Sequence, residues 1–80
     1  MDRAKLLEEI QQVVQQVLPR TVVQLSERST AKDIPGWDSL SHMVLMAAIE
    51  KHFNLKFSFI EMINISDIGS MMDCIMEKLG

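Results

Sequence analysis

The sequence has little of what several classes of protein depend on. Its single cysteine, Cys74, cannot form a disulfide within the chain, and no spacing of Cys and His resembles a zinc site. The longest uninterrupted apolar run, Met43 to Ile49, is far shorter than the roughly 20 residues of a membrane-spanning helix. The N-terminus also lacks the apolar stretch of a signal peptide. We therefore expect a cytoplasmic protein with no metal site and no membrane partner.

Positive charge is scarce as well. Lys and Arg number 8 against 11 Asp and Glu, which gives a net charge of −3 over 80 residues. Proteins that hold nucleic acids through phosphate contacts need a basic surface, so we expect no nucleic-acid partner. Apolar residues still make up 48% of the chain, which excludes disorder and allows a small core. We expect one monomeric domain over residues 1–80.

Apolar residues recur at helical spacing near both ends of the chain. In the first helix, expected between the N-cap Asp2 and Pro19, they form one stripe opposite glutamates and glutamines. In the last helix, expected after the cap Ser66, they form a second stripe. The apolar positions of these two helices are Leu6, Leu7, Ile10, Val13, Val14, Val17 and Leu18, and Ile68, Met71, Met72, Ile75, Met76 and Leu79.

The stretch from Arg20 to Trp37 shows no sustained period and is expected to be a long ordered loop. A short helical turn is expected near Thr21 to Leu25. Five apolar residues of this stretch should pack against the helices; they are Val22, Val23, Leu25, Ile34 and Trp37. A tryptophan beside a turn is more often a packing anchor than a partner contact, so we favour the first role for Trp37.

The second helix, expected from about Ser39 to Phe53, is apolar on more than one face. A domain of this size has too few neighbours to bury such a helix entirely, so part of it should meet a partner. We assign Leu45, Met46, Ile49 and Phe53 to the core. We assign Leu40, Met43, Val44 and Ala47 to an exposed partner-binding strip, where methionine suits a surface that meets several partners. The alternative is that Met43 and Val44 pack under the long loop.

A short helix is expected between the second and the last. Ser58 and Glu61 fit a capping box, so this helix begins after Ser58 and ends near Asn64. The fold class predicted from the sequence is therefore all-α: a small four-helix bundle with three longer helices, one short helix and a long first loop.

The segment that precedes the second helix delivers one serine to its first turn. Pro35-Gly36 is a strong turn signal, and Asp38 follows it where helical periodicity begins, so Asp38 is the expected N-cap. Ser39 then lies among unpaired backbone N–H groups at the positive end of the helix dipole. A hydroxyl in that environment tolerates an attached phosphate, so Ser39 is a candidate modification site.

An enzymatic interpretation of Asp38, Ser39 and His42 is also considered, since a nucleophile needs a base within hydrogen-bond reach. Residues so close on one helix rarely converge on a third group, and the sequence offers no oxyanion hole. We therefore expect no catalysis. His42 should flank the modified serine or lie half-buried beneath it, and Cys74 should be a small core residue or a half-exposed one.

The triplet Asp38-Ser39-Leu40, entered through Gly36-Trp37 and followed by an apolar helix, resembles the prosthetic-group site of acyl carrier proteins. The order and lengths of the helical segments resemble that family over nearly the whole chain. The resemblance implies that a phosphopantetheinyl transferase, with Mg²⁺, attaches 4′-phosphopantetheine from coenzyme A to Ser39, beside Asp38 and Leu40. It implies a carrier that holds acyl groups as thioesters on this arm and catalyses nothing itself. The partners implied are the transferase and acyl-transferring or acyl-activating enzymes.

Two positions depart from the members of this family that serve fatty-acid synthesis. Those members usually carry acidic residues just after the serine, where this chain has Ser41 and Val44. Electrostatic attraction between this surface and the basic patches of partner enzymes would therefore be weaker. We therefore expect a dedicated carrier for a specialised lipid, polyketide-like or surface-modification pathway.

Two alternatives stay open at this point. Aminoacyl or peptidyl carriers of peptide synthetases usually have glycine where Trp37 stands, and they are embedded in large chains. A small helical interaction module without a prosthetic group would use Met43, Val44 and Ala47 as a docking face. Intact mass after incubation with coenzyme A, Mg²⁺ and a transferase separates the carriers from such a module.

Overall fold

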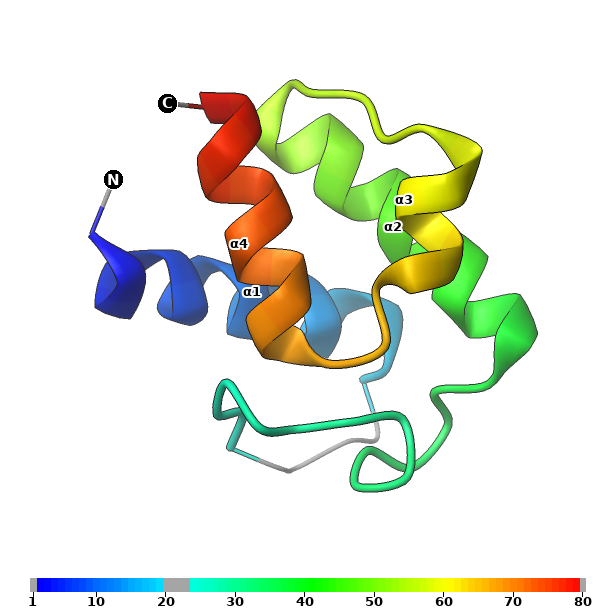
Figure 1. Ribbon diagram of the computed structural model, residues 1–80. Coiled ribbons are helices and arrows are strands. Elements are labelled where there is room, and N and C mark those ends of the chain that lie inside the picture. Colours follow the sequence, from blue (N-terminus) through cyan, green and yellow to red (C-terminus); the bar gives the residue numbers. More distant parts are fainter. Residues whose placement is uncertain (1, 20–23, 80) are drawn as a thin grey trace.

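The computed structural model describes residues 2–19 and 24–79, which contain four helices and no strand (Figure 1). The helices are α1 (Arg3–Val17), α2 (Ser39–Phe53), α3 (Phe59–Asn64) and α4 (Ile68–Leu79). The predicted all-α fold, with three longer helices, one short helix and a long first loop, is therefore confirmed. Within the described ranges, no helix is both long and apolar enough to cross a membrane.

Local hydrogen bonds decide where the first two helices begin and end. The side chain of Asp2 accepts the N–H of Ala4 at 3.2 Å, so the predicted cap of α1 is confirmed. Pro19 follows the C-cap of α1, as expected for a residue that cannot continue a helix. α2 ends at Phe53 because the next residue, Asn54, adopts the left-handed conformation with φ of 55°.

The capping box predicted for α3 is present and also ties this helix to α4. Ser58 Oγ accepts the N–H of Glu61 at 3.2 Å, and Glu61 Oε1 accepts the N–H of Ser58 at 2.7 Å. Lys78 of α4 pairs with the same carboxylate at 2.9 Å. The pKa of Glu61 is lowered to about 2, mainly by the hydrogen bond from the Ser58 N–H and to a lesser extent by Lys78.

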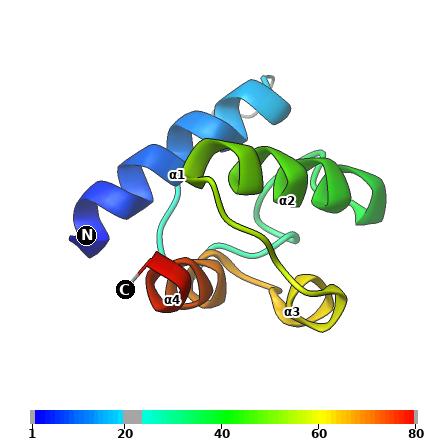
Figure 2. The same ribbon diagram turned by 90° about the horizontal axis from the view of Figure 1, so that it is seen from above.

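The core lies where the three longer helices meet the loop. Figure 2 shows α1 beside α2 in one layer and α4 with α3 in the other. α1 packs chiefly against α2 and also against α4. The core residues predicted on α2 (Leu45, Met46, Ile49 and Phe53) are all buried, and they meet Leu6, Ile10, Val13 and Val14 of α1 and Ile68, Met71, Met72 and Ile75 of α4. Leu79, at the end of the predicted stripe, is instead 44% exposed.

The long first loop packs as predicted where it is described. Leu25, Ile34 and Trp37 are buried, which confirms Trp37 as a packing anchor. Val22 and Val23 lie outside the described residues, as does most of the expected helical turn, and Leu25 is not helical.

The loop also satisfies the first backbone donors of α4. Ile68 N–H donates to the carbonyl of Ser29 at 2.9 Å, and Gly69 N–H donates to the carbonyl of Glu27 at 2.8 Å. A Cβ atom at Gly69 would stand 2.8 Å from that Glu27 oxygen, closer than side-chain carbons approach. The absence of a side chain at Gly69 is therefore what allows the loop to reach the helix.

The predicted cap of the last helix, Ser66, is wrong, because Asp67 takes that position. Asp67 Oδ1 accepts the N–H of Ser70 at 2.7 Å, and this bond lowers the pKa of Asp67. The loop holds the N–H of Ile68, so α4 begins one residue later than a cap at Ser66 would require. The capping side chain is then the one that directly precedes Ile68.

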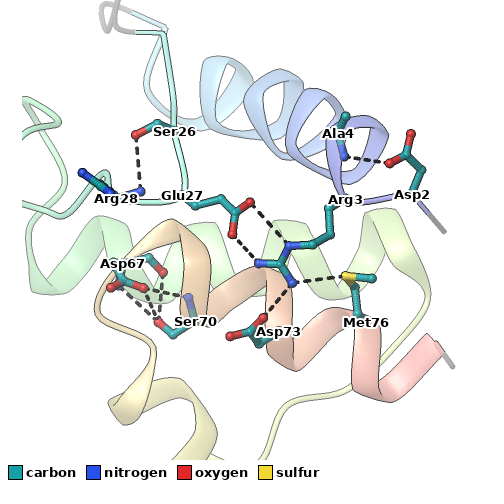
Figure 3. Close-up of polar contacts among 10 residues, drawn as sticks. All are labelled: Asp2, Arg3, Ala4, Ser26, Glu27, Arg28, Asp67, Ser70, Asp73 and Met76. Atoms are coloured by element: carbon teal, nitrogen blue, oxygen red, sulfur yellow. Dashed lines mark hydrogen bonds and ion pairs between the residues drawn. The ribbon is translucent and has the colours of Figure 1, made fainter.

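An arginine joins α1, the loop and α4 at the end of the molecule near the N-terminus. Arg3 lies between Glu27 and Asp73 (Figure 3), with Nε 3.4 Å from Glu27 Oε2 and Nη1 2.7 Å from Asp73 Oδ1. Nη1 also reaches the sulfur of Met76 at 3.5 Å. Both carboxylates raise the pKa of Arg3 above its ordinary value, and Glu27 has the larger effect. The guanidinium therefore stays charged and holds the three segments together.

Candidate functional site

The turn before α2 needs one glycine. Trp37 N–H donates to the carbonyl of Ile34 at 3.2 Å, and Asp38 N–H donates to the carbonyl of Gly36 at 3.2 Å. Gly36 has φ of 87°, in the left-handed region where other residues are strained. The turn buries Trp37 and leaves Asp38 and Ser39 exposed.

Asp38 caps α2 as predicted, in a reciprocal arrangement with a residue that the sequence analysis did not assign to it. Asp38 Oδ1 accepts the N–H of Ser41 at 2.8 Å, and Ser41 Oγ accepts the N–H of Asp38 at 3.1 Å. Ser41 Oγ also contacts the carbonyl of Gly36. The Ser41 N–H lowers the pKa of Asp38, so a carboxylate stands at the helix N-terminus at neutral pH. Serine at this third position escaped prediction because capping boxes usually have Glu or Gln there.

Ser39 is the first residue of α2 and lies exposed at an open hollow of about 300 Å³. The predicted position of Ser39 in the first helical turn is thus confirmed. The loop, α2 and the segment that joins α3 to α4 all contribute to the hollow, which is lined by Ala31, Trp37, Asp38, Ser39, His42, Ile63, Ile65 and Ser66. Sequence analysis did not find Ile63 or Ile65, because only tertiary packing brings them to Ser39.

His42 lies half-buried at this hollow and uses both ring nitrogens for structure. Trp37 Nε1 donates to its Nδ1 at 3.0 Å, and its Nε2 is 2.8 Å from the carbonyl oxygen of Met62. Trp37 can only donate and the carbonyl can only accept, so the ring is neutral with its proton on Nε2. His42 is therefore not free to act as a base for Ser39.

The predicted strip on α2 faces solvent. Leu40, Met43 and Val44 are 77%, 47% and 52% exposed, and Ala47 is also exposed. The alternative in which Met43 and Val44 pack under the long loop is wrong. The loop does not cover them because its hydrogen bonds hold it against α4.

α3 carries a second apolar surface, which sequence analysis missed. Phe59, Ile60 and Ile63 are 70%, 68% and 61% exposed, and their spacing places them on one face of the helix. A helix of six residues is too short for its periodicity to separate a buried face from an exposed one. Only the packed structure shows that no residue of α3 is fully buried.

No metal or thiol chemistry is indicated in the described part of the chain. Across these residues, no three His, Cys, Asp or Glu side chains are grouped so that they could hold a metal ion. Cys74 is half-exposed on α4, with its sulfur 3.7 Å from Glu61 Oε2. Burial, and then the nearby Glu61 charge, raise the pKa of the Cys74 thiol, which makes it a poor nucleophile.

Comparison with known proteins identifies the family. Residues 8–75 match the family described as phosphopantetheine attachment site. The solution NMR structure of a holo acyl carrier protein from Geobacter metallireducens matches with a TM-score of 0.83 and 33% sequence identity, over 91% of this chain and 84% of that one. The chain belongs to the acyl carrier protein family. No curated protein sequence matches it significantly.

Membership of this family distinguishes a carrier with a prosthetic group from an interaction module without one, two classes of protein that the sequence left open. An acyl carrier protein bears a 4′-phosphopantetheine group and is a carrier rather than an enzyme. An interaction module without a prosthetic group is therefore excluded. Such carriers work with a phosphopantetheinyl transferase and with acyl-handling enzymes.

Proposed function

We propose that Ser39 is the attachment residue of this acyl carrier protein. In the loading step, the Ser39 hydroxyl displaces adenosine 3′,5′-bisphosphate from coenzyme A, and its proton passes to a base of the transferase. The product is a phosphodiester that links Ser39 to an arm ending in a thiol. Acyl groups are then attached to that thiol as thioesters, and the tether keeps them at high effective concentration for each partner enzyme.

The observation that carries this proposal is the position of Ser39 as an exposed first residue of α2 beside an open hollow. Backbone N–H groups at a helix N-terminus favour a phosphodiester there, and the hollow leaves room for the first atoms of an arm. Other serines have structural tasks, since Ser41 closes the cap of α2 and Ser58 caps α3. Ser66 is exposed at the same hollow but precedes no long helix directly.

Intact mass spectrometry tests the assignment. Incubation of the chain with coenzyme A, Mg²⁺ and a broad-specificity phosphopantetheinyl transferase should add the mass of one phosphopantetheine. Fragmentation should place the added mass on the peptide that contains Ser39. A product modified at Ser66 or Ser41 instead would refute the assignment.

The strip formed by Leu40, Met43, Val44 and Ala47 is proposed to meet partner enzymes. It is exposed, and the first turn of α2 contains no acidic residue. Recognition by apolar contact fits a dedicated carrier of a specialised lipid, polyketide-like or surface-modification pathway better than one of fatty-acid synthesis. Peptidyl carriers usually have glycine where this chain has Trp37, which favours acyl cargo over aminoacyl cargo. An arm derived from coenzyme A fits a cytoplasmic carrier.

A further inference from the structure

Most polar side chains around the hollow beside Ser39 already have partners within the fold. The indole N–H of Trp37 bonds to His42, and the other ring nitrogen of His42 bonds to the Met62 carbonyl, so neither ring has a hydrogen left to donate. Asp38 is a carboxylate at neutral pH and can only accept hydrogen bonds. A donor for a group bound in the hollow must therefore come from another part of its lining.

Ser66, on the segment that joins α3 to α4, is the exception. It is exposed and lines the same hollow as Ser39. Its hydroxyl makes no hydrogen bond to any residue that the structure describes. A hydroxyl can rotate to suit its partner and can both donate and accept. Apart from Ser39 itself, Ser66 thus carries the one uncommitted side-chain donor among the described residues of the lining.

The chain on both sides of Ser66 is held in place. Ile65 is buried in the core, and an isolated antiparallel bridge pairs Thr30 of the loop with Asp67. Asp67 also accepts the N–H of Ser70 as the cap of α4 (Figure 3). Ser66 is therefore fixed at the hollow by its neighbours, whereas its own side chain has no part in that arrangement.

The rest of the lining suits the part of a phosphopantetheine arm that lies next to its attachment serine. That part consists of a phosphodiester and a pantoyl group, which carries methyl groups, a hydroxyl and an amide. Ala31, Ile63 and Ile65 offer apolar walls for the methyl groups. The phosphodiester and the amide carbonyl need hydrogen-bond donors, and the anionic Asp38 repels the first and can donate to neither. Ser66 is the side chain of the described lining that can supply a donor.

We propose that the Ser66 hydroxyl donates a hydrogen bond to an oxygen of the attached arm and holds the arm in the hollow when no partner enzyme is bound. Ser66 is then a positioning residue of the loaded carrier and takes no part in the loading chemistry. One hydrogen bond between neutral protein and arm contributes little net stability, so the arm remains able to leave the hollow for an enzyme. The proposal rests on the assignment of Ser39 as the attachment residue.

Three variants test this role. Ser66→Ala removes the hydroxyl, and Ser66→Thr keeps it. Asn64→Ala is the matched control, because Asn64 is an exposed polar residue of α3 that does not line the hollow. Each chain is prepared without the arm and again after incubation with coenzyme A, Mg²⁺ and a broad-specificity transferase. Intact mass and fragmentation confirm one arm per chain on Ser39, and both forms are compared at neutral pH by NMR and by thermal melting.

The backbone amide resonance of Ser66 should shift when the arm is attached, although Ser66 is far from Ser39 in the sequence. Residue 66 should keep this shift in Ser66→Thr and lose most of it in Ser66→Ala. Without the arm, wild type and Ser66→Ala should melt within about 1 °C of each other, because the hydroxyl has no partner in the fold. With the arm, Ser66→Ala should melt about 2–4 °C below wild type, whereas Ser66→Thr and Asn64→Ala should change with loading as wild type does.

Several results would overturn the proposal. If loading at Ser39 changes the melting temperature and the residue 66 resonance equally in wild type and Ser66→Ala, then Ser66 does not hold the arm although Ser39 stands as the attachment residue. A wild-type chain that gains no arm, or gains it on another serine, would overturn both assignments. An unloaded Ser66→Ala chain that already melts 2–4 °C lower, by about the loss expected of the loaded one, would give the hydroxyl a structural task instead. The same loss in loaded Asn64→Ala would assign the effect to the whole segment rather than to the hydroxyl.

Discussion

Trp37 donates its indole N–H to Nδ1 of His42 at 3.0 Å, and the far side of the same imidazole reaches the carbonyl oxygen of Met62 at 2.8 Å. One ring thus joins the long loop, α2 and α3. The rings of Trp37 and His42 are nearly parallel, at an angle of 17°, with centroids 5.8 Å apart. Because Asp38 and Ser39 directly follow Trp37, this junction sets the position of the site relative to α3.

Replacing this histidine should destabilise the fold. His42→Leu leaves the Trp37 N–H and the Met62 carbonyl without their partner, which should cost about 1–3 kcal/mol. Urea denaturation followed by the fluorescence of Trp37, the only tryptophan, measures the loss. His52→Leu on the same helix is the control. His52 pairs with Glu9 at the surface, so this variant should lose only about 0–1 kcal/mol of the free energy of unfolding. Equal losses in the two variants would contradict a structural role for the His42 bonds.

Ser39→Ala should fold like wild type and fail to accept phosphopantetheine. The hydroxyl contributes little to the helix while Asp38 remains as cap. Intact mass after incubation with coenzyme A and transferase should show no gain, with an unchanged thermal melt. Ser66→Ala, which alters the other exposed serine of the same hollow, should load normally. Loading of the Ser39→Ala variant would refute the attachment site.

Asp38→Ala should affect both stability and loading, because the side chain caps α2 next to Ser39. Loss of the cap should lower the melting temperature by about 4–8 °C. Loading by the transferase should also slow, since the Ser39 backbone loses its anchor. Asp38→Asn keeps a capping oxygen without the charge and should melt close to wild type. If loading of Asp38→Ala is unchanged while its stability falls, Asp38 is structural only.

The stability that the Asp38 carboxylate adds should also depend on pH in a defined direction. Its pKa is lowered in the folded state, so the contribution is present above the ordinary value of 3.8 and is lost as pH falls through the lower folded value. The difference in melting temperature between wild type and Asp38→Asn should therefore be constant near neutral pH and change only in acid. A change near neutral pH would point to another group.

Gly69→Ala separates two opposing effects. Helix propensity alone predicts a gain of up to about 1 kcal/mol. The new methyl group would stand 2.8 Å from the carbonyl oxygen of Glu27, a backbone atom that cannot move freely. We expect the clash to win, with a net loss of about 1–3 kcal/mol in urea denaturation. A more stable variant would mean that the loop is not held against α4 as described.

Val44→Glu tests whether recognition at the α2 strip is apolar. The cognate partner should bind it more weakly, because a charge would be desolvated against an apolar surface, whereas enzymes of fatty-acid synthesis should use it better. Rates with the cognate partner should change little between low and moderate salt, since apolar burial is not screened. A steep salt dependence, or an unimpaired Val44→Glu variant, would assign recognition to the remaining acids Asp38, Glu50, Glu61 and Asp67.

The sequence by itself determined the features that depend on neighbours along the chain. The bounds of α2 from Ser39 to Phe53, its cap Asp38 and the Ser58 box all follow from hydrogen bonds within four residues. The buried positions of α2 follow from helical spacing, because a helix can bury only the stripe that faces its neighbours.

Only the tertiary structure decided the features that join distant segments. The cap of α4 falls on Asp67 because loop carbonyls more than 35 residues away hold Ile68 and Gly69. His42 takes its role from Trp37 and from the Met62 carbonyl on another helix. The exposed face of α3 and the hollow beside Ser39 likewise arise only when α3 packs against α2. Such contacts depend on which distant segments meet when the chain folds, and the local pattern of residue types does not specify those segments.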